Sequence, residues 1–112
     1  QDMITDFGGK IPQPYGVPVE EIQEGITHGV RKINVDTDCR MAMTAAIRKV
    51  FATKPEEFDV RKYMGPAMEE MQKVCEARYE QFGAAGMASK IKPIRLCDMA
   101  KRYASGELNH KI

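Results

Sequence analysis

The chain has 112 residues, with 17 lysine or arginine residues against 16 aspartate or glutamate residues, and 43% of its residues are hydrophobic. This length allows one modest hydrophobic core. A net charge of +1 produces no strong electrostatic attraction for nucleic acid or a membrane surface. The sequence contains no apolar run long enough to cross a bilayer. The chain opens with Gln1-Asp-Met-Ile instead of a translation start, so we expect a fragment or a processed product.

The first half of the chain alternates helical and extended patterns. Hydrophobic spacing and turn residues predict a short helix, an irregular connection, a second helix, a β-strand and a third helix at residues 1–7, 10–16, 18–28, 30–35 and 38–53. The order helix, strand, helix is typical of a parallel α/β sheet or barrel. One strand cannot make a sheet, so we expect its neighbours to lie on other polypeptide, upstream or in another chain.

The second half of the chain shows helical patterns only. A charged linker at residues 54–61 precedes a long helix that Pro66 opens, and Pro93 opens a last helix. We expect the apolar stripes of both helices to be core, with a Met-rich binding groove as the alternative for the long helix. The stripes consist of Met68, Met71, Cys75, Tyr79 and Phe82, and of Leu96, Cys97, Ala100, Tyr103 and Ala104. The tail at residues 107–112 is expected to be loose.

Cysteines and histidines are few. Cys39, Cys75 and Cys97 are widely spaced and lack a Cys-x-x-Cys pair, which favours free thiols in a reducing cytoplasm over disulfides or a metal site. His28 falls in the last turn of a predicted helix, where packing or a dipole contact explains it better than catalysis. With His110 as the second histidine, an internal metal centre would be short of ligands. We expect a cytoplasmic protein.

Polar residues at the junction after the predicted strand form a candidate site. Asn34 lies near the end of this strand, and Asp36 and Thr37 open the next helix. A strand that leads into a helix N-terminus offers free N–H groups and the positive end of a dipole, which suit phosphate. Two interpretations stay open from these residues, a phosphate-ester site or only a helix cap.

Three stretches carry a more specific pattern. They are Gly16-Val-Pro-Val-Glu-Glu-Ile22, Gly25-Ile-Thr-His-Gly-Val-Arg-Lys-Ile-Asn-Val-Asp-Thr-Asp-Cys-Arg40 and Phe58-Asp-Val-Arg61. The pattern resembles the class II fructose-bisphosphate aldolases, most closely the Calvin-cycle type. The resemblance covers nearly the whole chain, but it corresponds only to the C-terminal third of such an enzyme.

The resemblance implies a fold and an activity. The fold is a TIM (β/α)8 barrel, with residues 30–36 as its last strand, residues 1–55 as its last helix-strand-helix units and residues 56–112 as a C-terminal helical extension. The activity is that of a lyase, the reversible cleavage of fructose 1,6-bisphosphate into dihydroxyacetone phosphate and glyceraldehyde 3-phosphate. It serves glycolysis, gluconeogenesis and the Calvin cycle. The cofactor is zinc, which polarises the ketone and stabilises the enediolate.

The resemblance also implies site residues at the strand-to-helix junction. Asn34, Val35, Asp36 and Thr37 match the segment that binds dihydroxyacetone phosphate. Asn34 would hydrogen-bond the reacting end of the substrate and hold the enediolate. The hydroxyl and backbone of Thr37, with the N–H near Asp36, would bind the phosphate. The Asp36 side chain is expected to cap a helix or hold a neighbouring cation.

Arg61 matches an arginine that reaches into the neighbouring subunit's site and pairs with the far phosphate, which implies a homodimer or homotetramer. A planar guanidinium suits that task. Val60 stands where the family pattern leads us to expect proline. The alternative interpretation of Arg61 is a solvated surface charge.

The family's zinc-binding histidines and its proton-transferring aspartate correspond to positions upstream of this segment. His28 and His110 match no ligand position. We therefore expect this chain by itself to hold no zinc and to be inactive without the upstream part of the same enzyme. Two alternatives remain, a sister aldolase acting on tagatose bisphosphate and a non-catalytic helical interaction module that binds a partner through its Met-rich face.

Overall fold

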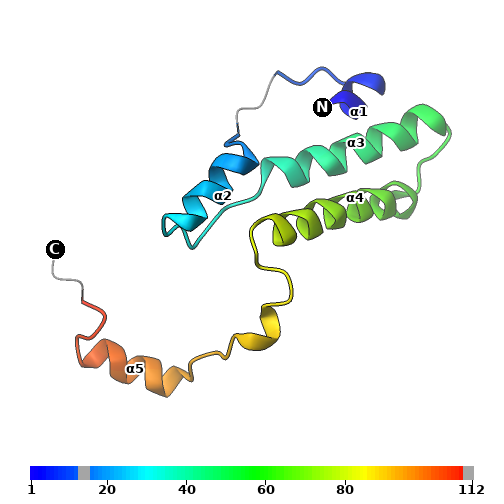
Figure 1. Cartoon of the computed structure of the whole chain (residues 1–112). Helices are drawn as coiled ribbons and strands as arrows, with labels where there is room; N and C mark the ends of the chain where they lie inside the picture. Colours follow the sequence, from blue (N-terminus) through cyan, green and yellow to red (C-terminus); the bar gives the residue numbers. More distant parts are fainter. Residues whose placement is uncertain (13–15, 110–112) are drawn as a thin grey trace.

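The computed structural model describes residues 1–12 and 16–109, which form helices joined by loops (Figure 1). The elements are α1 (Asp2–Asp6), α2 (Val19–Thr27), α3 (Thr37–Thr53), α4 (Val60–Gln81), a 3₁₀ helix η1 (Ala88–Lys90) and α5 (Leu96–Ala104). Helices α1, α2 and α3 confirm those predicted at residues 1–7, 18–28 and 38–53. Within the described ranges, no helix is both long and apolar enough to cross a membrane.

Some predictions fall partly or wholly outside the described residues. Residues 13–15 of the predicted connection, residues 110–112 of the predicted tail and the side chain of His110 are among them. Residues 10–12 have no regular secondary structure, in agreement with a connection, and residues 105–108 form turns.

The β-strand predicted at residues 30–35 is wrong for this chain, because the segment between α2 and α3 forms no strand. A strand is defined by hydrogen bonds to a neighbouring strand, and the described part of the chain contains none. The segment runs instead as an irregular connection and ends at Asp36, whose carbonyl accepts a hydrogen bond from the Arg40 N–H at 3.1 Å. The chain is therefore mostly helical, and a barrel is not formed by these residues alone.

Helices α3 and α4 form an antiparallel pair that holds most of the buried side chains (Figure 1). The buried residues of the pair are small, which lets the helices approach closely. They are Cys39, Ala45, Ala46 and Ala67. Near the loop between the helices, the rings of Phe51 and Tyr63 lie 5.0 Å apart between centroids. Helix α1 packs on α3 and buries Ile4.

Helix α4 begins at Val60, earlier than the start predicted at Pro66. The Asp59 side chain caps the helix, because its carboxylate accepts a hydrogen bond from the Arg61 N–H at 3.0 Å. The cap starts the helix within the predicted linker, and the helix then continues through Pro66. Proline inside a helix leaves the carbonyl four residues earlier, that of Lys62, without its usual donor. The last helix begins at Leu96 rather than Pro93.

The Asp59 cap should make the start of α4 sensitive to acid. The Arg61 side chain and backbone N–H donate to the Asp59 carboxylate and hold its pKa below the usual value of about 3.9. The stabilisation is thus fully present above the unfolded pKa and is lost as the pH falls through the lower, folded pKa. We expect the amide chemical shifts of residues 60–63 to lose helical character below about pH 4. Asp59→Asn should remove this pH dependence, and wild-type shifts that stay helical down to about pH 2 would contradict the prediction.

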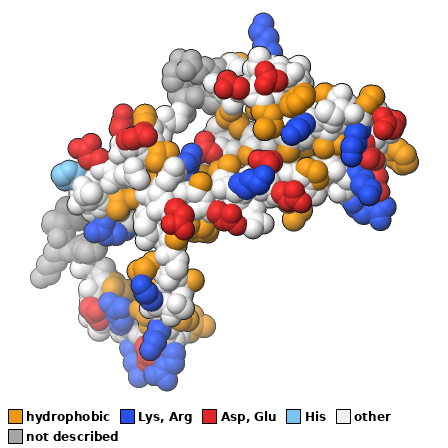
Figure 2. All heavy atoms as spheres, turned by 45° about the vertical axis from the view of Figure 1, so that its right-hand side comes forward, with side chains coloured by type: hydrophobic (Ala, Val, Ile, Leu, Met, Phe, Trp, Pro, Cys, Tyr) orange, Lys and Arg blue, Asp and Glu red, His pale blue; other side chains and the backbone are white. Residues whose placement is uncertain are grey.

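The apolar stripes predicted to be core on α4 and α5 remain largely exposed. On α4, Met68 and Tyr79 are 64% and 60% exposed, and on α5, Leu96 is 89% exposed. Helix α5 stands on an arm away from the helical pair, and Figure 2 shows hydrophobic side chains at the surface of both parts. The radius of gyration is 20.0 Å, against about 13 Å for a compact domain of this length. Within the described residues the core prediction for these stripes is wrong, and exposed apolar side chains grouped on one helix face often mark an interaction surface.

Candidate functional site

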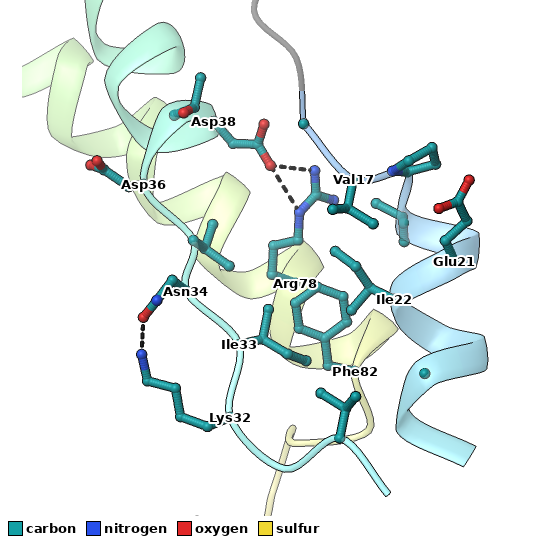
Figure 3. Close-up of a pocket in the computed structure, with 17 residues that line it drawn as sticks. Val17, Glu21, Ile22, Lys32, Ile33, Asn34, Asp36, Asp38, Arg78 and Phe82 are labelled. Atoms are coloured by element: carbon teal, nitrogen blue, oxygen red, sulfur yellow. Dashed lines mark hydrogen bonds and ion pairs between the residues drawn. The ribbon is translucent and has the colours of Figure 1, made fainter. Parts of the chain in front are cut away.

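A hollow of about 720 Å³ lies where the segment before α3 meets the start of α2 and the end of α4 (Figure 3). Its lining includes Asn34, Val35, Asp36 and Thr37, four of the five predicted site residues. Apolar side chains form another part of the wall, among them Ile22 of α2 and Phe82, the residue that follows α4 (Figure 3). The hollow thus joins a polar strip of backbone to an apolar floor, as small-molecule sites commonly do.

Side chains alternate in direction along the segment before α3. Ile33 points toward the end of α4, whereas Lys32 and Asn34 lie on the opposite side of the backbone (Figure 3). Ile33 and Val35 are half-buried, and the polar residues Lys32, Asn34 and Asp36 are exposed. A period of two is the side-chain pattern of a β-strand. The segment therefore keeps an apolar face toward the helices and a polar face away from them, although it pairs with no strand in the described part of the chain.

The Lys32 ammonium group orients the Asn34 amide. Lys32 Nζ donates a hydrogen bond to Asn34 Oδ1, and an ammonium group can only donate. This contact assigns the oxygen of the amide and turns its NH₂ group, which has two donors, away from the lysine. The two amide donors of Asn34 therefore face away from Lys32 and lie beside its positive charge.

No side chain of the described residues caps the N-terminus of α3, so its first backbone N–H groups donate no capping hydrogen bond to Asp36. Asp36 occupies the N-cap position, but its carboxylate makes no capping hydrogen bond and accepts instead from Arg40 Nε at 2.8 Å. The N–H groups of the first turn, from Thr37 and Asp38, are among those that no intrahelical carbonyl can satisfy. A helix N-terminus in this state favours an anion.

Arg78 is a residue of this wall that sequence reasoning missed. Its guanidinium reaches from α4 to Asp38 in the first turn of α3, with 2.7 Å between Nη2 and Oδ2. The Arg78 side chain is 23% exposed. One signal was present in the sequence, because a charged residue three positions after Cys75 and four before Phe82 falls on the predicted apolar stripe of the helix.

The sequence of this segment matches a known family. A model of the family described as fructose-bisphosphate aldolase class-II matches residues 14–87, well over half of the chain. The chain belongs to this family. The match includes the whole hollow and the α3–α4 pair, so the resemblance predicted from the sequence is confirmed.

Curated relatives of this chain are named fructose-bisphosphate aldolase. The chain is 66% identical over 105 residues to a fructose-bisphosphate aldolase of Xanthobacter flavus, which covers 94% of this chain and 30% of the relative. It is 62% identical over 107 residues to a fructose-bisphosphate aldolase of Nostoc commune, again covering 30% of the relative. A Rhodobacter capsulatus protein named fructose-bisphosphate aldolase 2 is 59% identical, and the match covers 97% of it. The chain thus spans about 30% of the length of the first two relatives.

Arg61 is not brought to the hollow of this aldolase-family chain. It lies in the first turn of α4, where its Nη2 is 2.6 Å from Asp59 Oδ2 and its side chain is 85% exposed. Arg78 is 17 residues further along the same helix, which corresponds to about 26 Å. A contact of Arg61 with substrate bound beside Asn34 in the same chain is therefore excluded by this geometry, and its role in a neighbouring subunit stays a prediction.

Metal-binding side chains are sparse in the described ranges. Residues 1–12 and 16–109 contain no group of three or more histidine, cysteine, aspartate or glutamate side chains arranged to hold a metal ion. His28 is the C-cap of α2 and is exposed.

The thiols of Cys39 and Cys75 lie 4.0 Å apart across the helical pair, and both are free. Burial, followed by the contact with Cys75, raises the pKa of the Cys39 thiol, which keeps it protonated and unreactive at neutral pH.

Proposed function

We propose that residues 1–112 form one wall of the active site of a class II fructose-1,6-bisphosphate aldolase. The enzyme cleaves fructose 1,6-bisphosphate reversibly into dihydroxyacetone phosphate and glyceraldehyde 3-phosphate, in glycolysis, gluconeogenesis and the Calvin cycle. The observation that carries the proposal is the polar strip Asn34–Thr37, which lines a hollow next to an uncapped helix N-terminus in a chain of this family. It would act in the cytoplasm, without a nucleic-acid or membrane partner.

The residues of the strip would contact different parts of dihydroxyacetone phosphate. The Asn34 NH₂ group would donate to the oxygen at the reacting end and hold the negative charge that develops there. The Thr37 hydroxyl and the N–H groups near Asp36 would bind the phosphate, supported by the helix dipole. Val35 would contribute backbone to the wall, while its side chain packs toward the helices.

The rest of the enzyme would supply the missing structure. Residues 30–36 would become the last strand of a (β/α)8 barrel when neighbouring strands pair with them. The alternation of Ile33 and Val35 with polar neighbours supports this, because barrel strands face helices on one side and the barrel interior on the other. Residues 1–55 would form the last barrel units, and residues 56–112 the helical extension.

Zinc, which we infer as the cofactor, would be held by the upstream part of the enzyme. The described side chains of this chain do not fit a metal centre, so we assign no step through the metal to them. This division of labour leads us to expect no aldolase activity from residues 1–112 alone. Arg61 would serve the far phosphate in a neighbouring subunit of a homodimer or homotetramer, which its exposed guanidinium allows.

A chimaeric enzyme tests the proposed function. Residues 1–112 replace the matching segment of the Xanthobacter flavus aldolase, and cleavage of fructose 1,6-bisphosphate is measured with zinc supplied. We expect kcat/KM within about tenfold of the parent enzyme, about 1.4 kcal/mol in transition-state stabilisation. The parent without its C-terminal segment and residues 1–112 alone are the controls, and both should be inactive.

The same experiment separates the two alternatives. A higher kcat/KM with tagatose 1,6-bisphosphate than with fructose 1,6-bisphosphate would select the sister aldolase. The exposed Met68 and Tyr79 face favours an interaction module as the other alternative. An inactive chimaera, together with a monodisperse and cooperatively melting monomer of residues 1–112, would select the module.

A further inference from the structure

We infer that Arg78 is a positioning residue for phosphate binding, because it neutralises the Asp38 carboxylate beside Thr37. The inference rests on the proposed function, since it concerns the anion that the first turn of α3 would bind. It goes beyond that proposal by giving a task to a residue on another helix. Arg78 itself would touch no substrate.

The contact between the two residues is specific. Arg78 Nε and Nη2 both donate to Asp38 Oδ2, at 3.2 and 2.7 Å. The residues are 40 positions apart in the sequence, so the pair ties the first turn of α3 to the last turns of α4. The Arg78 side chain is 23% exposed and the Asp38 side chain 47% exposed, so water screens this pair less than a fully exposed one.

The end of α4 that carries Arg78 is held in place from a second side. Gln23 of α2 donates from Nε2 to the carbonyl of Gln81 at 2.9 Å. Figure 3 shows Arg78 between Asp38 and the Val17 and Ile22 side chains, with Phe82 below it. The guanidinium thus lines the hollow and contacts the first turn of α3 through Asp38.

An uncompensated carboxylate at this turn would oppose phosphate binding. Asp38 follows Thr37 directly, so a negative charge there repels a phosphate dianion on the same turn. Asp36 poses the same problem and is paired with Arg40, but the Arg40 side chain is 77% exposed and its charge is well screened. Each acidic residue of the turn therefore has an arginine partner, and the partner of Asp38 is the less solvated one.

Charge compensation predicts a specific pattern of kinetic effects in the chimaeric enzyme. Arg78→Met should raise KM for fructose 1,6-bisphosphate and the inhibition constant of inorganic phosphate by roughly tenfold, with kcat changed by less than about threefold. Asp38→Asn combined with Arg78→Met should bring both constants back to within about threefold of wild type, because the unpaired negative charge is gone. Arg78→Lys should retain most of the affinity, since it keeps the charge without the fork. Arg40→Met is the matched control, with an expected rise below about threefold.

Other outcomes would overturn the inference. A double variant as impaired as Arg78→Met would show that the contact itself, and not the charge, is required. A fall confined to kcat, or unchanged constants in Arg78→Met, would also contradict it.

Failure of the proposed function is distinguishable, because it would appear as an inactive wild-type chimaera. The inference is then decided on residues 1–112 by titration with inorganic phosphate, followed through the amide signals of Thr37 and Asp38. Weaker binding in Arg78→Met and recovery in the double variant support it. Equal shifts in all three proteins, or no shift in any of them, overturn it.

Discussion

Replacing Asn34 by alanine in the chimaeric enzyme is expected to lower kcat/KM for fructose 1,6-bisphosphate by on the order of 10²-fold or more. Lys32 Nζ donates to the Asn34 amide oxygen, which directs the NH₂ group away from the lysine, and in the proposed reaction this group would stabilise charge at the reacting end. The loss should appear mainly in kcat, because the interaction strengthens as the enediolate forms. Steady-state kinetics in the cleavage direction measure this effect.

The control for this variant is the same change, asparagine to alanine, at a position outside the hollow. Asn109→Ala changes an exposed residue of the described C-terminal end and should leave kcat and KM unchanged. Far-ultraviolet circular dichroism should be the same for both variants and wild type. An Asn34→Ala enzyme with near wild-type kcat would remove this residue from the reaction and favour the alternative in which the junction is only a helix cap.

Replacing Ala67 by leucine is expected to lower the free energy of unfolding of residues 1–112 by about 1–3 kcal/mol or more. Ala67 is 0% exposed within the α3–α4 pair, so three extra carbon atoms must push the helices apart. The chain buries few side chains, so its free energy of unfolding should be small. We therefore expect the substitution to unfold most of its helical structure. Circular dichroism at increasing urea measures it.

Ala77 provides the matched control on the same helix. It is exposed, so Ala77→Leu adds the same atoms to the opposite environment and should leave the urea midpoint nearly unchanged. Equal midpoints for Ala67→Leu and Ala77→Leu would show that the two helices do not pack in solution as they do in this structure.

The helices could be predicted from the sequence because their signals are local. Periodic apolar residues fixed α2 and α3 to within one or two residues. The start of α4 was predicted too late. Two local signals for a helix start, a capping Asp59 and a first-turn Pro66, lie seven residues apart, and the helix begins after Asp59. The failures at the 30–35 strand and the exposed α4 stripe have a different cause. Strand pairing and burial both depend on a partner surface, which the described residues do not supply.

The candidate site was predictable where it is continuous in the sequence. Asn34 to Thr37 lie on four consecutive positions, so their joint place in the hollow followed from the motif. The contacts of Lys32 and Arg78 depend on side-chain geometry, and in the case of Arg78 on the packing of two helices, which the sequence does not display. The task proposed for Arg61 would depend on a second subunit, and in this chain its side chain is exposed and pairs with Asp59.

The measurement that tests the central claim most directly is kcat/KM for fructose 1,6-bisphosphate of the chimaera that carries residues 1–112. The claim is that these residues supply a working wall of a class II aldolase site. We predict zinc-dependent cleavage within about tenfold of the Xanthobacter flavus parent. A chimaera that folds and assembles like the parent, but shows no cleavage above the level of the parent without its C-terminal segment, would contradict the claim.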